Sequence, residues 1–102
     1  MKWRLALCNA AALALLAQGA LAADGAAMFQ EKCGSCHVRG GLATPVNPAD
    51  KAAVVWGKYF KRGRHRADFS DRISDEELQD IVGYLEEHAA DSEMPEAAAI
   101  PR

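Results

Sequence analysis

Two cysteines and a histidine form the one short motif that predicts specific chemistry. Residues 33–37 read Cys-Gly-Ser-Cys-His, the attachment signature of a c-type haem. Two thiols separated by two residues can each add to one vinyl group of the same porphyrin and form two thioether bonds. The next residue then places an imidazole under the iron. The motif therefore predicts one covalent haem, with Cys33 and Cys36 binding the cofactor and His37 binding the metal as proximal ligand.

The first 23 residues have the pattern of a secretory signal peptide. Lys2 and Arg4 form a positive segment, residues 5–16 form an apolar run, and residues 20–22 read Ala-Leu-Ala, a small-x-small cleavage site. The apolar run is shorter than the ~20 residues that cross a bilayer, so an uncleaved anchor is the weaker alternative. We expect residues 1–23 to be removed on export to the periplasm and residues 24–102 to form one domain.

Two other uses of the cysteine pair have less support. A thioredoxin-like redox pair needs a βαβ context, and no β-rich runs flank Cys33 and Cys36. A zinc site needs further ligands. Removal of the signal peptide takes away Cys8, so the mature chain has no second cysteine pair. Its other histidines, His65 and His88, are widely spaced. Covalent haem attachment is the favoured interpretation.

Size and charge exclude several classes of protein. The chain has 102 residues, 12 Lys and Arg against 14 Asp and Glu, and a formal net charge of −2. This balance does not fit a nucleic-acid binder, and the length does not fit a large enzyme with its own buried cleft. A mature chain of about 80 residues rarely stabilises itself through its core alone. A cofactor that adds buried apolar surface is therefore expected.

The first half of the mature chain reads as two helices separated by a loop. An unbroken stretch predicts a helix over residues 25–32, and glycines and prolines predict a loop from Gly40 to Pro48. A second helix is expected over residues 49–61, opened by Pro48 and ended by Gly63. The face expected to be buried consists of Ala52, Val55, Trp56 and Tyr59.

The second half contains the clearest helix signal, and no strand pattern is present. Ser74 and Glu77 form a capping box that opens this helix. Its core-facing stripe consists of Leu78, Ile81, Val82 and Leu85. Residues 91–102, with Pro95 and Pro101, are expected to form an extended tail along the surface.

The order helix, Cys-x-x-Cys-His, loop, helix, loop, capped helix resembles the class I cytochrome c family across nearly all of residues 24–102. The residues that carry the resemblance are Gly25, Phe29, Cys33, Cys36, His37, Ile73–Glu77, Tyr84 and Leu85. The resemblance implies an all-α fold of three to four helices around one covalently attached haem c. It also implies a close crossing of the first and last helices, with a packing role for Gly25 and Gly83.

The sixth iron ligand is where the sequence departs from this family. Most members place a methionine in the loop before the last helix, but here that loop, residues 63–69, contains no methionine and one histidine, His65. We therefore expect bis-histidine ligation by His37 and His65. The alternatives are Met94 folded back from the tail, an open or water-bound site, His88 and Met28. The family also implies that His37 donates its second ring N–H to a proline carbonyl, that of Pro45 or Pro48.

Two further residues are candidates for binding the haem propionates. Trp56 could donate its indole N–H to a propionate, as aromatic residues in this region do in related cytochromes, or it could be a core residue alone. Arg64, and Arg66 beside it, could pair with a propionate or lie on a solvated loop face.

The charges are separated along the chain. Six basic residues and two acids lie between residues 58 and 72, whereas residues 73–101 contain nine acids and no Lys or Arg. The basic residues are Lys58, Lys61, Arg62, Arg64, Arg66 and Arg72. Such a charge dipole can orient the molecule on a charged partner.

The resemblance implies a monohaem electron carrier and not an enzyme. Its partners are expected to be redox proteins, with no nucleic acid and no membrane insertion, and the carrier is expected to be monomeric. Some bis-histidine relatives shuttle electrons between outer-membrane haem conduits and the inner-membrane respiratory chain, and we expect such a route here. The alternatives are a haem-based small-ligand sensor or minor peroxidase with a displaceable sixth ligand, and a thiol–disulfide protein.

Overall fold

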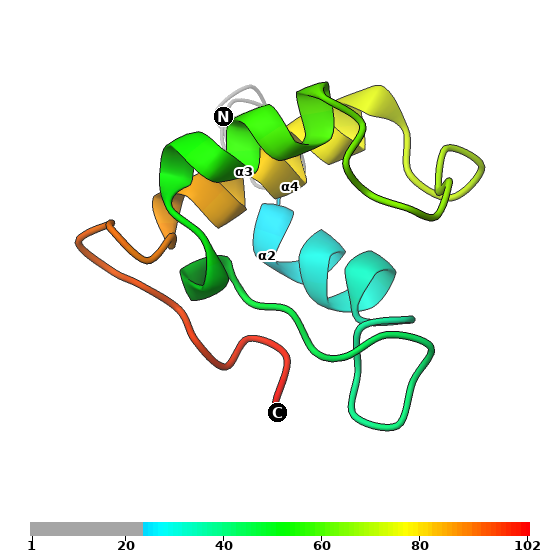
Figure 1. Ribbon diagram of the computed structural model, residues 1–102, viewed down its shortest axis with the longest axis horizontal. Coiled ribbons are helices and arrows are strands. Elements are labelled where there is room, and N and C mark those ends of the chain that lie inside the picture. The colour runs from blue at the N-terminus through cyan, green and yellow to red at the C-terminus, as the bar shows by residue number, and fades with distance from the viewer. Residues whose placement is uncertain (1–23) are drawn as a thin grey trace, which may run out of the picture.

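Helices provide the regular structure of this chain. The computed structural model describes residues 24–102, so the expected signal peptide lies outside the described residues. The elements are α2 (Gly25–Met28), a π-helix (Phe29–Cys33), a 3-10 helix (Pro48–Asp50), α3 (Ala53–Lys61) and α4 (Asp75–Glu87) (Figure 1). Residues 24–102 contain no β-strand, which confirms the all-α class. No helix in this part of the chain has the length and hydropathy needed to span a membrane.

The first helix runs straight into the cysteine motif. The Asp24 carboxylate caps it by accepting from the Ala27 N–H at 3.0 Å. From Phe29 the turns widen, and the Gly34 N–H donates to the Phe29 carbonyl at 3.2 Å. The helix expected over residues 25–32 is confirmed, but its π-helical second half was not predicted. Such wide turns are frequent at functional sites.

The second helix begins four residues later than expected. Pro48 opens only a single 3-10 turn, because the backbone of Lys51 is extended (φ −139°, ψ 157°) and breaks the helix. The helix restarts at Ala53, whose N–H donates to the Asp91 carboxylate at 2.9 Å. The start of α3 is therefore set by a residue 38 positions further along the chain.

The buried face of α3 also differs from the prediction. Trp56 is buried as expected, but Val55 is 43% exposed. Ala53 and Phe60 pack against the core in its place. The end of the helix is confirmed: Gly63 has a φ of +61°, and the Arg64 N–H donates to the Tyr59 carbonyl, which closes the helix through a left-handed residue.

Helix α4 follows its sequence signals except at Val82, which is only partly buried and does not belong to the core cluster. Ser74 and Glu77 bond each other's backbone N–H at 3.1 and 3.0 Å, which confirms the capping box. Ile81 and Leu85 are buried, and Leu78 packs against them. Helix α4 crosses α2 closely, since a Cβ on Gly25 would lie 2.4 Å from the Asp80 carbonyl oxygen. The packing role expected for Gly83 is wrong, because within residues 24–102 no atom outside its own helix turn lies within 4 Å of its Cβ position.

The C-terminal tail has no regular structure, as expected, but it is attached to the core. Ile100 is only 3% exposed. Figure 1 shows the tail leaving α4 and returning beneath the α2 and 3-10 segments. The sequence did not predict this anchor, since a single apolar residue between alanines and a proline has no periodic pattern.

Candidate haem site

The cysteine motif folds as one tight turn after the π-helix. The N–H groups of Cys36 and His37 both donate to the Cys33 carbonyl, at 3.3 and 2.9 Å. The two thiols are unpaired, and burial, followed by the charge of Cys36, raises the pKa of Cys33 to about 11.

The His37 ring is oriented by one backbone hydrogen bond. Its Nδ1 lies 2.8 Å from the Thr44 carbonyl oxygen. A carbonyl can only accept, so Nδ1 carries the proton and Nε2 keeps a free lone pair for a metal. The acceptor is thus Thr44, and the expectation of the Pro45 or Pro48 carbonyl is wrong. Pro45 still has a part, because the residue before a proline is held in an extended conformation.

His65 faces His37 from the loop after α3. The two ring centres are 6.0 Å apart and the planes are inclined by 65°. The Nδ1 of His65 donates to the Ala67 carbonyl at 2.7 Å, so its Nε2 is also free. The rings of His65 and Phe69 pack in a T-shaped arrangement with their centres 4.9 Å apart, which holds the imidazole in place.

The spacing of the two rings fits a metal between them. Metal–imidazole bonds are roughly 2 Å long, so two imidazoles that bind one iron through Nε2 from opposite sides have ring centres about 6 Å apart. A hollow of about 290 Å³ opens beside His65, and its apolar walls include Phe60, Phe69, Ile73 and Leu78. Two free imidazole nitrogens, two thiols and an apolar wall are the groups that a covalent haem requires.

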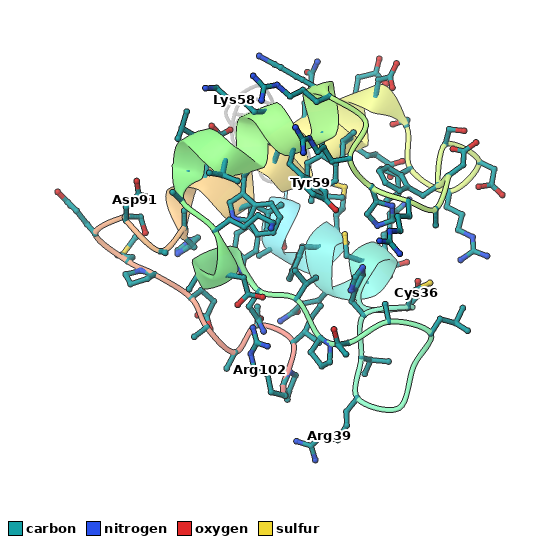
Figure 2. The ribbon with its side chains drawn as sticks, in the orientation of Figure 1. Cys36, Arg39, Lys58, Tyr59, Asp91 and Arg102 are labelled. Carbon is teal, nitrogen blue, oxygen red and sulfur yellow. The ribbon has the colours of Figure 1, made fainter. Side chains whose placement is uncertain are left out.

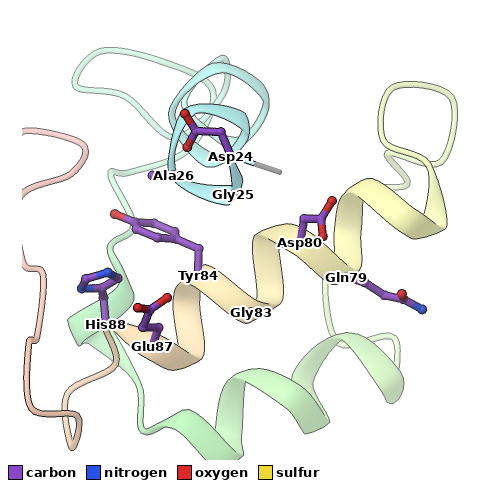
Figure 3. Close-up of a pocket in the computed structure, with 9 residues that line it drawn as sticks. All are labelled: Asp24, Gly25, Ala26, Gln79, Asp80, Gly83, Tyr84, Glu87 and His88. Carbon is purple, nitrogen blue, oxygen red and sulfur yellow. The ribbon is translucent and has the colours of Figure 1, made fainter. Parts of the chain in front are cut away.

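The other ligand candidates lie elsewhere in the molecule. Met94 is in the tail and 59% exposed. His88 caps the end of α4, where its Nδ1 donates to the Met94 carbonyl at 2.7 Å. It lines a second hollow, of about 480 Å³, together with Asp24, Asp80 and Tyr84 (Figure 3). Met28 packs against the core. Among residues 24–102, His65 is thus the candidate whose ring lies opposite His37.

The structure changes the interpretation of Trp56. Its indole N–H donates to the Pro48 carbonyl at 2.8 Å, and the residue is 3% exposed. An indole has one donor, so this bond corrects the prediction that Trp56 donates to a haem propionate and favours the core alternative. Arg64 is exposed, and its side chain has no hydrogen-bond or ion-pair partner within residues 24–102.

Two residues that support the site were missed by the sequence analysis. Thr44 accepts from His37 through a backbone oxygen, for which the only sequence signal is the proline that follows. Asn47 is completely buried in the same segment, and its amide bonds both the N–H and the carbonyl of Ile100. No local pattern marks a buried asparagine whose partner is 53 residues away.

A helical chain of this size with a site for one covalent haem is a small c-type cytochrome. Comparison with known proteins agrees with this class. The family described as cytochrome C oxidase, cbb3-type, subunit III matches residues 20–85. Cytochrome c6 of Thermosynechococcus vestitus (strain NIES-2133 / IAM M-273 / BP-1) is 33% identical over 107 residues, which cover 88% of this chain and 96% of the relative.

Two further relatives carry the same name. Cytochrome c6 of Thermostichus vulcanus is 33% identical with the same coverage. Cytochrome c6 of Synechococcus elongatus is 29% identical over 79 residues, covering 67% of this chain and 91% of the relative. No solved structure gives a significant match. The chain belongs to the class I cytochrome c family, and it is an electron-transfer cytochrome with one covalently bound haem c.

Proposed function

We propose that this cytochrome is an exported, bis-histidine electron carrier. Cys33 and Cys36 would hold the haem, and His37 and His65 would bind its iron. The observation that carries the proposal is the 6.0 Å separation of the two imidazole rings, each with its Nδ1 bonded to a backbone carbonyl and its Nε2 free. With both histidines bound, the iron would offer no open position to a substrate, which is the arrangement of an electron carrier.

The protein's contribution is to hold both ligands while the charge changes. The haem iron supplies a one-electron couple between its ferric and ferrous states. The carbonyls of Thr44 and Ala67 fix the two ring orientations, and Phe69 packs against His65. Methionine as a sixth ligand raises the reduction potential, so histidine in its place is expected to lower it. This suits a donor to carriers of higher potential, such as a shuttle between an outer-membrane haem conduit and the inner-membrane chain.

The sixth ligand is tested by comparing the wild type with His65→Ala and His65→Met. We expect the wild type to be low-spin in the ferric state without the charge-transfer band of a sulfur–iron bond. His65→Ala is expected to become high-spin and to bind carbon monoxide when reduced, and His65→Met to have a raised potential. Met94→Ala and His88→Ala are matched controls and should keep the wild-type spectrum.

Three results would contradict bis-histidine ligation. They are an unchanged spin state in His65→Ala, loss of the low-spin spectrum in Met94→Ala, and ready binding of carbon monoxide by the reduced wild type. The last result would instead favour a small-ligand sensor or a peroxidase.

Export is part of the proposal, and the mass of the mature protein tests it. Residues 1–23 have the charge and hydropathy of a cleaved leader. Holoprotein purified from a periplasmic fraction should begin at Ala23 or Asp24 and carry the added mass of one haem. Protein that still begins at Met1 would contradict cleavage.

We also propose that a basic surface, on α3 and the following loop that contains His65, docks an acidic redox partner. It consists of Lys58, Lys61, Arg62, Arg64 and Arg66, all exposed. Figure 2 shows Lys58 on the outer side of α3, the helix that leads into the His65 loop. Removal of the leader takes away Lys2 and Arg4 and leaves 10 basic against 14 acidic residues. The basic surface therefore opposes the net charge of the mature chain.

This opposition gives the docking proposal a clear test. If electrons pass near the basic surface, reduction of a small anionic oxidant should slow as salt is added, although the whole protein is negative. Lys61→Glu should weaken this salt dependence. Glu87→Lys, a charge change of the same size and opposite sign at the far end of α4, should leave it nearly unchanged. A rate that rises with salt in the wild type would show that the net charge, and not this surface, governs the encounter.

A further inference from the structure

The C-terminal tail is bonded to the segment that orients the proximal histidine. After α4 the chain turns back, and the Glu96 carbonyl accepts from the Ala49 N–H at 3.0 Å. Further on, the Ala99 carbonyl accepts from the Gln30 side chain at 3.1 Å. The family match ends at residue 85, so these contacts come from a part of the chain beyond it.

The central contact of the tail is a buried pair of hydrogen bonds. The Asn47 side-chain oxygen accepts from the Ile100 N–H at 2.8 Å, and its amide nitrogen donates to the Ile100 carbonyl at 2.9 Å. Asn47 is 0% exposed and Ile100 is 3% exposed. The oxygen and the nitrogen of the Asn47 amide are thus both hydrogen-bonded, in a buried place where water does not compete. A buried bond of this kind constrains position strongly, because no alternative partner is at hand.

Asn47 lies three residues after Thr44, whose carbonyl accepts from His37. The segment between them has no regular secondary structure and contains Pro45, whose ring fixes one backbone torsion. At its start, the Ala43 N–H donates to the Cys36 carbonyl at 3.0 Å. At its end, Asn47 is bonded to the tail and also donates its own N–H to Asp50 at 2.9 Å. The Thr44 oxygen is therefore held between an anchor on the cysteine motif and an anchor on the tail.

We propose that Asn47 is a positioning residue for the proximal ligand: by bonding Ile100 of the tail, it fixes the Thr44 carbonyl against His37 Nδ1 and so tunes the reduction potential. The proposal rests on His37 as an iron ligand and does not depend on which group is the sixth ligand. A hydrogen bond to the outer ring nitrogen raises the basicity of a metal-bound imidazole. A more basic ligand favours the ferric state, so a looser Thr44 contact should raise the potential.

The experiment measures the reduction potential and the melting temperature of the holoprotein in parallel. Asn47→Ala removes both bonds to Ile100 and should shift the potential upward. Ile100→Ala keeps the backbone groups but removes the buried side chain that holds them, and should shift it in the same direction by less. Gln30→Ala is the matched control: it removes a surface bond to the same tail at Ala99 and should leave the potential unchanged.

The outcomes separate positioning from stability alone. A lowered melting temperature with an unchanged potential in Asn47→Ala would overturn the proposal, as would an equal shift in Gln30→Ala. If Asn47→Ala does not fold, the shift in Ile100→Ala decides in the same way. Protein that carries no covalent haem would contradict the proposed function as a whole, whereas haem-loaded protein with an unchanged potential contradicts this inference alone.

Discussion

The same local hydrogen bond occurs at all three histidines, so it does not by itself distinguish a ligand from a surface residue. His37, His65 and His88 each donate from Nδ1 to a backbone carbonyl, of Thr44, Ala67 and Met94 respectively. In every case Nε2 is left with its lone pair. What separates His65 from His88 is the position of the ring, since only the ring of His65 lies opposite His37 among the described residues.

An ion pair between the first helical segment and α4 provides a prediction on pH. The Lys32 ammonium lies 2.8 Å from the Glu77 carboxylate. Lys32 and the Ser74 N–H together lower the pKa of Glu77 to about 2 from an ordinary 4.5. Because the folded pKa is depressed, this carboxylate stabilises the fold fully above pH 4.5, and its contribution is lost as the pH falls towards 2.

Glu77→Gln should therefore lower the melting temperature at pH 7 and have little effect near pH 2. Glutamine can still close the capping box, so the change isolates the charge. Glu76→Gln, one residue earlier and without an ion pair in residues 24–102, is the control and should show a smaller difference at pH 7. A Glu77→Gln deficit that is equal at both pH values would show that the charge is not the cause.

At the scale of elements, the close crossing of α2 and α4 depends on Gly25. Gly83, the other glycine predicted to take part, is not needed for it. Gly25→Ala places a Cβ 2.4 Å from the Asp80 carbonyl oxygen and 2.9 Å from the Tyr84 Cβ. Neither atom can move freely, because the Asp80 oxygen belongs to the helix backbone and the Tyr84 Cβ is attached directly to it. We expect a loss of about 1–3 kcal/mol in the free energy of unfolding, measured by chemical denaturation.

Gly83→Ala is the matched change on α4 and should have the opposite sign. Among the described residues, no atom beyond the neighbouring backbone of α4 lies within 4 Å of its Cβ position. Alanine in a helix interior is better than glycine by about 0.5–1 kcal/mol. If both variants lose stability to a similar extent, the close approach at Gly25 is not what limits the crossing.

The start of α3 depends on a cap supplied by the tail. The residue before the helix, Ala52, has no side-chain acceptor, and the Asp91 carboxylate bonds the Ala53 N–H instead. Asp91→Ala should cost about 1 kcal/mol, as for other lost N-caps. Glu93→Ala, an exposed acid two residues along, should cost much less. Equal losses from both variants would point to general charge and not to capping.

For the whole molecule, the described core is small and the cofactor is expected to complete it. The buried apolar residues are Phe29, Trp56, Ile73, Ile81, Leu85, Ala89 and Ile100. A domain of this size buries a limited share of its surface and is marginal without further support. We predict that Cys33→Ser/Cys36→Ser protein, made without attached haem, is largely unfolded by circular dichroism. A cooperative thermal transition in this variant would contradict the prediction.

Much of the chain's character follows from local sequence. The cysteine motif, the capping box at Ser74 and the glycine stop at Gly63 each act within a few residues, so their patterns suffice to locate the haem attachment site and two helix ends. The absence of methionine from residues 63–69 likewise directs attention to His65. These features are decided by short-range bonds and covalent geometry, which the order of residues specifies directly.

The tertiary structure decided which groups bond across loops and between segments, over separations of 7 to 53 residues. The proximal acceptor is Thr44, the first residue of α3 is capped by Asp91, Trp56 donates to Pro48, and Asn47 pairs with Ile100 in the core. Each of these is a backbone carbonyl or N–H that finds a partner only when the tail and loops pack. Nearly every residue type has such a backbone group, so the amino-acid sequence does not indicate which of them will form the bond.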